Sequence, residues 1–178
     1  MVDETRELDL HSLSLRQGQG ISDGWGKFMY EAASACLENQ GHKFGVRLKV
    51  DGAYDVKFSL LWQNLSQEVY SIWQDSEEAI EYGAYGISIL LMIELTEYKF
   101  IERSYKGTGF DFWLGTNSLL FQQKARLEVS GILNGDEAKI NIRAKQKLEQ
   151  TTCSDGTRLP VYIVIVEFGT PRSKIIRR

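Results

Sequence analysis

The stretch Val161-Tyr-Ile-Val-Ile-Val166 decides the fold, because all six of its residues are β-branched or aromatic. A run that is apolar at every position is typical of a strand at the centre of a sheet, where both faces are covered. Pro160 stands at its start, where a missing N–H does least harm to strand pairing. The stretch therefore predicts a central strand between two layers of helices.

Working outward, Asn134-Gly135-Asp136 opens a charged helix that is expected to end near residue 150. Asp75 and the acidic residues after it predict the start of a long helix to about residue 96, since carboxylates stabilise the positive end of a helix. Three strands are predicted between the two helices, at residues 98–103, 109–115 and 125–130. The order helix, three strands, helix, strand fits an α+β fold with a mixed central β-sheet flanked by helices.

The chain before this core carries a helix and a hairpin. Ser22 and Asp23 cap a predicted helix whose apolar side chains recur three and four residues apart as far as Leu37. Apolar and polar residues alternate between residues 46 and 62, and Asp51-Gly52 is a turn signal within this segment. These patterns predict an N-terminal helix and β-hairpin extension.

We interpret residues 1–178 as a single domain, because no repeat or linker divides them. Its expected parts are a loose arm at residues 1–20, the extension at residues 21–74 and the core at residues 75–178. The basic last segment, residues 173–177, is expected to add an edge strand.

The amino-acid composition argues against several classes of protein. The chain is 43% hydrophobic and its net charge is −3, so it can bury a core and does not have the bulk charge of a nucleic-acid binder. Its two cysteines lack the spacing of a zinc site. The first residues do not resemble a signal peptide, and the longest apolar run, residues 87–93, is too short to span a membrane. A cytoplasmic protein without a membrane segment is expected.

Two carboxylates are expected to converge on the sheet. Period-two alternation places Asp111 on one face of the second strand and Glu128 on one face of the third. If the apolar faces of these strands align, both carboxylates project from the same side. Carboxylate oxygens are the ligands that Mg²⁺ or Mn²⁺ prefers, so Asp111 and Glu128 are the predicted metal ligands.

This αβββαβ order, with Gly109-Phe110-Asp111 on the second strand and Leu127-Glu128-Val129-Ser130 on the third, resembles the core of the PD-(D/E)XK restriction-endonuclease-like superfamily. The resemblance covers about residues 75–168. It implies that Asp111 and Glu128 bind the metal and that Glu81 or Glu78 on the first helix joins them. The implied activity is metal-dependent cleavage of phosphodiester bonds in DNA or RNA.

Ser130 stands where the superfamily has a lysine that positions the attacking water. Serine carries no charge, so either another cation has taken this role or the site is inactive. The candidate cations are Arg126 and Lys124 on the same strand, or two lysines of the following helix, Lys139 and Lys145. Two hypotheses remain: a nuclease, or an inactive nuclease-fold protein that serves as a binding or scaffold module. A homodimer or a protein partner also stays open.

Each candidate also has a plain structural alternative. Asp111 can pair with Lys106 or Arg126 across a tight turn, and Glu128 can lie on an edge strand. Glu78 and Glu81 can belong to a solvated first turn of the helix.

Overall fold

The computed structural model describes residues 5–16, 19–117 and 122–178. Its helices are α1 (Asp23–Asn39), α2 (Gln67–Ile72), α3 (Ser76–Leu95) and α4 (Glu137–Gln150), with short 3₁₀ helices η1 (Leu10–Leu15) and η2 (Thr151–Thr157). Its strands are β1 (Arg6–Asp9), β2 (Arg47–Gly52), β3 (Val56–Leu61), β4 (Phe100–Arg103), β5 (Phe112–Gly115), β6 (Ala125–Ile132), β7 (Val161–Glu167) and β8 (Arg172–Arg177). Within the described residues, the eight strands form one sheet in the order β1-β3-β2-β8-β7-β6-β5-β4.

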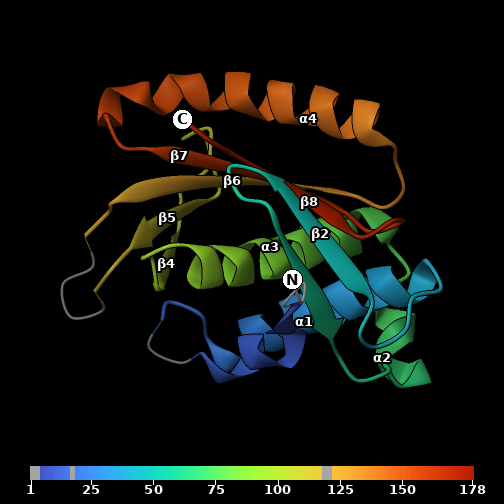
Figure 1. Cartoon of the computed structure of the whole chain (residues 1–178). Coiled ribbons are helices and arrows are strands. Elements are labelled where there is room, and N and C mark those ends of the chain that lie inside the picture. The colour runs from blue at the N-terminus through green and yellow to red at the C-terminus, as the bar shows by residue number, and fades with distance from the viewer. Residues whose placement is uncertain (1–4, 17–18, 118–121) are drawn as a thin grey trace.

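The sheet is covered on both sides, with α4 on one face and α1 and α3 on the other (Figure 1). Parallel and antiparallel neighbours are mixed, since β6 runs parallel to β7 and antiparallel to β5. All seven residues of β7 are buried, as expected of a central strand. The prediction of an α+β fold with a mixed sheet between helices is confirmed.

The helices begin at the predicted caps. Ser22 accepts a hydrogen bond from the backbone N–H of Trp25, and Asp75 accepts two from Glu77 and Glu78. These side chains satisfy N–H groups that have no partner within the helix. Although α3 is apolar along most of its length, no helix in the described part of the chain is long and apolar enough to cross a membrane.

The loose arm expected at residues 1–20 is wrong where the structure describes it. Residues 6–9 form β1, parallel to β3, and residues 10–15 form η1. Leu8, Leu10 and Leu13 are buried in the main core. A four-residue strand that continues directly into a 3₁₀ helix shows neither a helical nor a strand period for long enough to be recognised. Residues 1–4 and 17–18 of the arm lie outside the described residues.

The expected edge strand at residues 173–177 is also corrected. It is β8, and it lies inside the sheet between β2 and β7. The expected turn at Asp51-Gly52 is displaced, because β2 continues through Gly52 and the chain turns at residues 53–55. Gly52 has a φ of +97°, and a Cβ there would lie 2.2 Å from the carbonyl oxygen of Ile175 in β8. Glycine is needed here for contact with β8.

Gly131 allows α3 to lie directly against β6. A Cβ at this position would lie 2.4 Å from Cγ2 and 2.6 Å from the carbonyl oxygen of Ile80. The small residues Gly83 and Gly86 serve a different contact, since they face Ala33 and Met29 of α1. Close approach at Gly131 brings the first turns of α3 to the edge of β6.

We expect Gly131→Ala to lower the free energy of unfolding by about 1–3 kcal/mol, because the added methyl group must displace the backbone of α3. Urea unfolding measures this change. Gly24→Ala is the matched control, since a Cβ at Gly24 meets nothing within 4 Å. Equal stability of the two variants would show that α3 is free to move away from β6.

Candidate functional site

A cavity of about 720 Å³ lies between the first turns of α3, one edge of β6 and α4. Pairing of β5 with β6 ends at Phe112 and Leu127, so the following residues of β6 have no strand beside them on this edge. Asp111, Glu128, Glu81 and Ser130 all line the cavity. The structure therefore brings four of the five predicted site residues together.

Asp111, which directly precedes β5, continues the hydrogen bonding between β5 and β6 through its backbone and its side chain. Its backbone N–H donates to the carbonyl oxygen of Leu127, and its Oδ2 accepts the N–H of Val129 at 2.9 Å. Its Oδ1 accepts hydrogen bonds from Tyr85 Oη at 2.9 Å and from Arg103 Nη1 at 3.4 Å. The expected partners Lys106 and Arg126 are replaced by Arg103. Asp111 is thus held at the point where the two strands separate.

Tyr85 links Glu81 to Asp111. Its hydroxyl oxygen lies 2.8 Å from Glu81 Oε1 and 2.9 Å from Asp111 Oδ1. A phenol has a single proton, so it donates to one carboxylate at a time. Burial, and next the charge of Asp111, raise the pKa of Tyr85 well above its ordinary value, so the hydroxyl stays protonated. Glu81 therefore belongs to the site, whereas the exposed Glu78 does not line the cavity.

Glu128 is a buried carboxylate with one unsatisfied oxygen. The residue is 1% exposed, and its Oε1 accepts hydrogen bonds from Lys147 Nζ at 2.6 Å and Gln150 Nε2 at 3.0 Å. Its Oε2 is buried and has no donor among the described residues. Burial, and next the charge of Asp111, raise the pKa of Glu128 from 4.5 to about 7, against the lowering effect of Lys147. The carboxyl group can thus gain or lose a proton near neutral pH.

The three cations of the described chain that line the cavity come from α4. Arg143 Nη1 donates to Ser130 Oγ at 2.9 Å, so a guanidinium lies beside the position where the superfamily has its lysine. Lys139, Arg143 and Lys147 are four residues apart and line the cavity from one face of the helix. Sequence reasoning named Lys139 but missed Arg143 and Lys147. Their four-residue spacing from Lys139 was the available signal.

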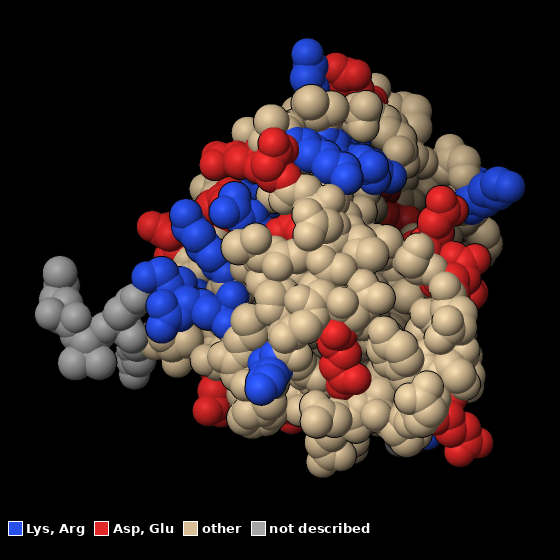
Figure 2. Space-filling view, turned by 90° about the vertical axis from the view of Figure 1, so that its right-hand side faces the viewer, with Lys and Arg blue, Asp and Glu red and all other residues tan. Residues whose placement is uncertain are grey.

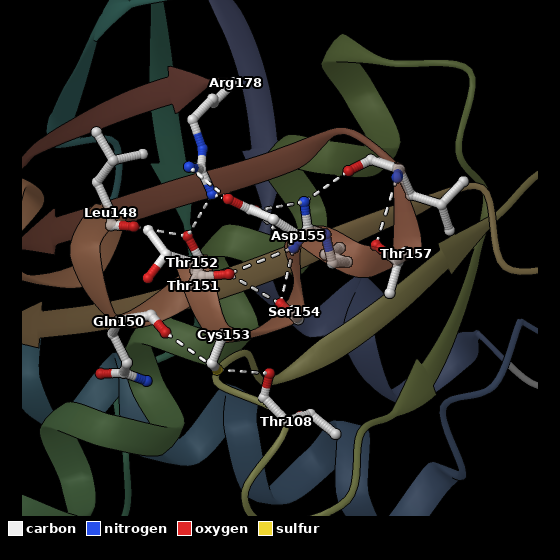
Figure 3. A network of polar contacts seen from close by, with 12 residues as sticks. Thr108, Leu148, Gln150, Thr151, Thr152, Cys153, Ser154, Asp155, Thr157 and Arg178 are labelled. Carbon is white, nitrogen blue, oxygen red and sulfur yellow. Dashed lines mark hydrogen bonds and ion pairs between the residues drawn. The ribbon is translucent and has the colours of Figure 1, made fainter.

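The other predicted cations do not reach the cavity. Arg126 is buried, and its Nη1 and Nη2 donate to Ser154 Oγ and to the carbonyl oxygen of Leu159, both at 2.7 Å. It also pairs with Asp155, which binds Arg178 at 2.6 Å in the network of Figure 3. Arg126 therefore joins β6 to η2 as a structural residue. The two lysines that also fail to line the cavity are exposed: Lys124 and Lys145.

The cavity contains two carboxylates, Asp111 and Glu128, of the kind that Mg²⁺ uses as ligands. No group of three or more Asp, Glu, His or Cys side chains in the described residues is arranged to hold a metal ion. Asp111 and Glu128 nevertheless line one cavity, where burial and next the charge of Asp111 raise the pKa of Glu128. Among the described residues, Glu128 Oε2 is a buried acceptor without a donor. Mg²⁺ commonly uses one or two carboxylates and completes its shell with waters and substrate oxygens.

No family model, curated protein or solved structure matches this chain. The site is therefore interpreted from its geometry and charge.

We expect the stability of the protein to fall as the pH rises from about 5 to about 8, because Glu128 must lose its proton inside the fold. The contribution of Glu128 to the free energy of unfolding is fully present below the pKa of 4.5 in the unfolded chain. It is lost as the pH rises through the pKa of about 7 in the folded protein. Urea unfolding across this range measures the loss. Glu128→Gln should flatten the profile. An unchanged profile in the variant would show that Glu128 titrates normally.

Proposed function

We propose that the protein is a metal-dependent nuclease that cleaves phosphodiester bonds in DNA or RNA. The observation that carries this proposal is one cavity in which Asp111 and Glu128 face Lys147 and Arg143. Paired carboxylates beside cations suit a reaction in which negative charge builds up on a phosphate. The order α3, β4, β5, β6, α4, β7 supports the resemblance to the PD-(D/E)XK superfamily.

Asp111 and Glu128 would hold Mg²⁺ or Mn²⁺, with Glu81 as the third carboxylate. A bound divalent ion would activate water and neutralise charge on the phosphate. Arg143 is placed to bind a non-bridging phosphate oxygen, because its guanidinium reaches the cavity and donates there to the neutral hydroxyl of Ser130. This arrangement supplies from α4 the positive charge that Ser130 cannot provide.

Glu128 would act as a metal ligand, so the proton of the attacking water would pass to solvent. The water oxygen forms a bond to phosphorus, the phosphorus–oxygen ester bond breaks, and the leaving oxygen takes a proton from solvent. Lys147 Nζ donates to Glu128 Oε1 and would stabilise the ionised carboxylate that holds the ion.

The proposal predicts that Mn²⁺ binds the wild-type protein and that Asp111→Asn abolishes this binding, because one negative charge and one ligand are lost. Isothermal titration calorimetry measures both. Glu102→Gln is the control, since Glu102 is an exposed carboxylate on the neighbouring strand β4. Binding that survives in Asp111→Asn would contradict the assignment of the ligand.

We further expect Arg143→Gln to lower the rate of polynucleotide cleavage by about 100-fold or more while Mn²⁺ binding is kept, since Arg143 contacts phosphate and not the metal. Lys145→Gln is the matched control, because Lys145 lies on the same helix and is exposed. The comparison uses labelled DNA and RNA substrates. Equal rates in the two variants would remove Arg143 from the mechanism.

A second function has its own support. Both carboxylates already have cationic partners, Arg103 for Asp111 and Lys147 for Glu128. Such pairing also suits a catalytically inactive nuclease-fold protein that binds nucleic acid or another protein. Absence of Mn²⁺ binding and of cleavage in the folded wild type would favour this alternative.

We place either activity in the cytoplasm. Cys36 and Cys153 are both free thiols, as is usual in a reducing compartment.

A further inference from the structure

A second charged feature of the sheet lies on β2, β3 and β8, away from β5. On β2 and β3, Leu48, Val50 and Phe58 are buried on the face that meets the main core. Side chains alternate along a strand, so Arg47, Lys49 and Lys57 point to the opposite face. This is the side of the sheet on which α4 packs against β6, β7 and part of β8.

Three cations on this face stand in one row across three strands. Lys57 of β3 is opposite Lys49 of β2, and Lys49 is opposite Arg172 of β8. We call Lys57, Lys49 and Arg172, together with the flanking Arg47 and Lys174, the basic face. Neighbouring strands lie about 4.8 Å apart, and like charges directly opposite each other are destabilising. The pairing therefore places Lys49 between two other cations.

The basic face contrasts with the rest of the molecule. The protein as a whole has a net charge of −3. The outward side chains of the three strands include one carboxylate, Asp51, which lies 4.0 Å from Lys174. Further acidic side chains, Glu7 and Asp9, occur on β1 at the sheet edge. Figure 2 shows several Lys and Arg side chains close together on one side of the molecule, with Asp and Glu side chains among them.

The basic face is connected to the candidate site through α4. Lys174 Nζ donates to Asn141 Oδ1 of this helix at 2.7 Å. Another face of α4 carries Lys139, Arg143 and Lys147 into the cavity. Cations therefore lie on two sides of α4, with Lys174 of the basic face toward β8 and the three cations of the helix in the cavity.

We infer that the basic face binds the phosphate backbone of a nucleic acid and guides it toward the cavity. A line of cations on an open sheet suits a long polyanion, because successive phosphates can be contacted without an enclosing pocket. The choice of nucleic acid rests on the proposed nuclease function. Binding at this face requires neither the metal nor cleavage.

The test compares two triple variants that lose the same charge. The first is Arg47→Gln, Lys49→Gln and Arg172→Gln together. The control removes three cations outside the basic face and the cavity: Lys27→Gln, Lys124→Gln and Arg158→Gln. Fluorescence anisotropy with labelled duplex DNA, single-stranded DNA and RNA measures affinity over a range of salt concentrations in the presence of a chelator.

We expect the first variant to bind at least tenfold more weakly at low salt, with a slope of log affinity against log salt that is smaller by about two to three, since each phosphate contact contributes about 0.9 on duplex DNA. The control should bind like the wild type. The first variant should unfold at no lower urea concentration than the wild type, because like charges are removed.

Three results would overturn the inference. They are no binding of nucleic acid by the wild type, an equal loss of nucleic-acid affinity in the two triple variants, or tighter binding to anionic lipid vesicles than to nucleic acid. Asp111→Asn separates this inference from the proposed function. If Asp111→Asn binds nucleic acid normally and neither the wild type nor any variant cleaves it, the basic face is kept as a binding surface and the nuclease function is rejected. If the wild type cleaves nucleic acid and the basic-face variant binds it like the control, only the role of the basic face is rejected.

Discussion

The whole sheet depends on the position of β8. This last strand pairs in antiparallel register with β7 and in parallel register with β2, so it alone connects the N-terminal hairpin to the strands that carry the site. The sheet is complete only when the C-terminal residues are in place, and such long-range pairing is slow to form. The alternation of β8 also sets which side chains lie on the face of the sheet away from the main core. Its apolar Ile175 is buried in the main core, and the alternate positions present Arg172 and Lys174 to the other side.

A second constraint is the burial of Glu128 on β6. An ionised carboxylate in this environment needs a cation, and Lys147 can supply it only while α4 lies on the sheet. The helix is held there by Ile140 and Ala144, which pack against β7 in a separate apolar cluster. The apolar face of α4 thus fixes the orientation of its charged face. Gly131 has the corresponding effect on the other side, since it lets α3 bring Glu81 and Tyr85 to the same cavity.

Local features could be predicted from the sequence, and long-range ones could not. The caps at Ser22 and Asp75 and the apolar run of β7 depend on neighbouring residues, so their patterns were sufficient. Asp111 and Glu128 both line the cavity as expected, but Asp111 precedes β5 and is placed by its hydrogen bond to the N–H of Val129, not by alternation within a strand at residues 109–115. The central position of β8 was not predicted, because a strand in which Lys or Arg alternates with apolar residues has the pattern of an edge strand. Arg143 and Lys147 were missed because their rotation around α4 is fixed only by packing on β7.

The ion pairs of the site are compatible with catalysis. Among the described residues, four carboxylates line the cavity beside three cations: Glu77, Glu81, Asp111 and Glu128, with Lys139, Arg143 and Lys147. Arg103 pairs with Asp111 but does not line the cavity. A divalent cation and a phosphate would enter together with opposite charges, so each could exchange partners without leaving a large net charge. A purely structural arrangement would gain from satisfying Glu128 Oε2, yet this oxygen is buried without a donor in the part of the chain that the structure describes. Buried groups with a raised pKa beside a cavity gather at functional sites, and this supports the proposed functional role of Glu128.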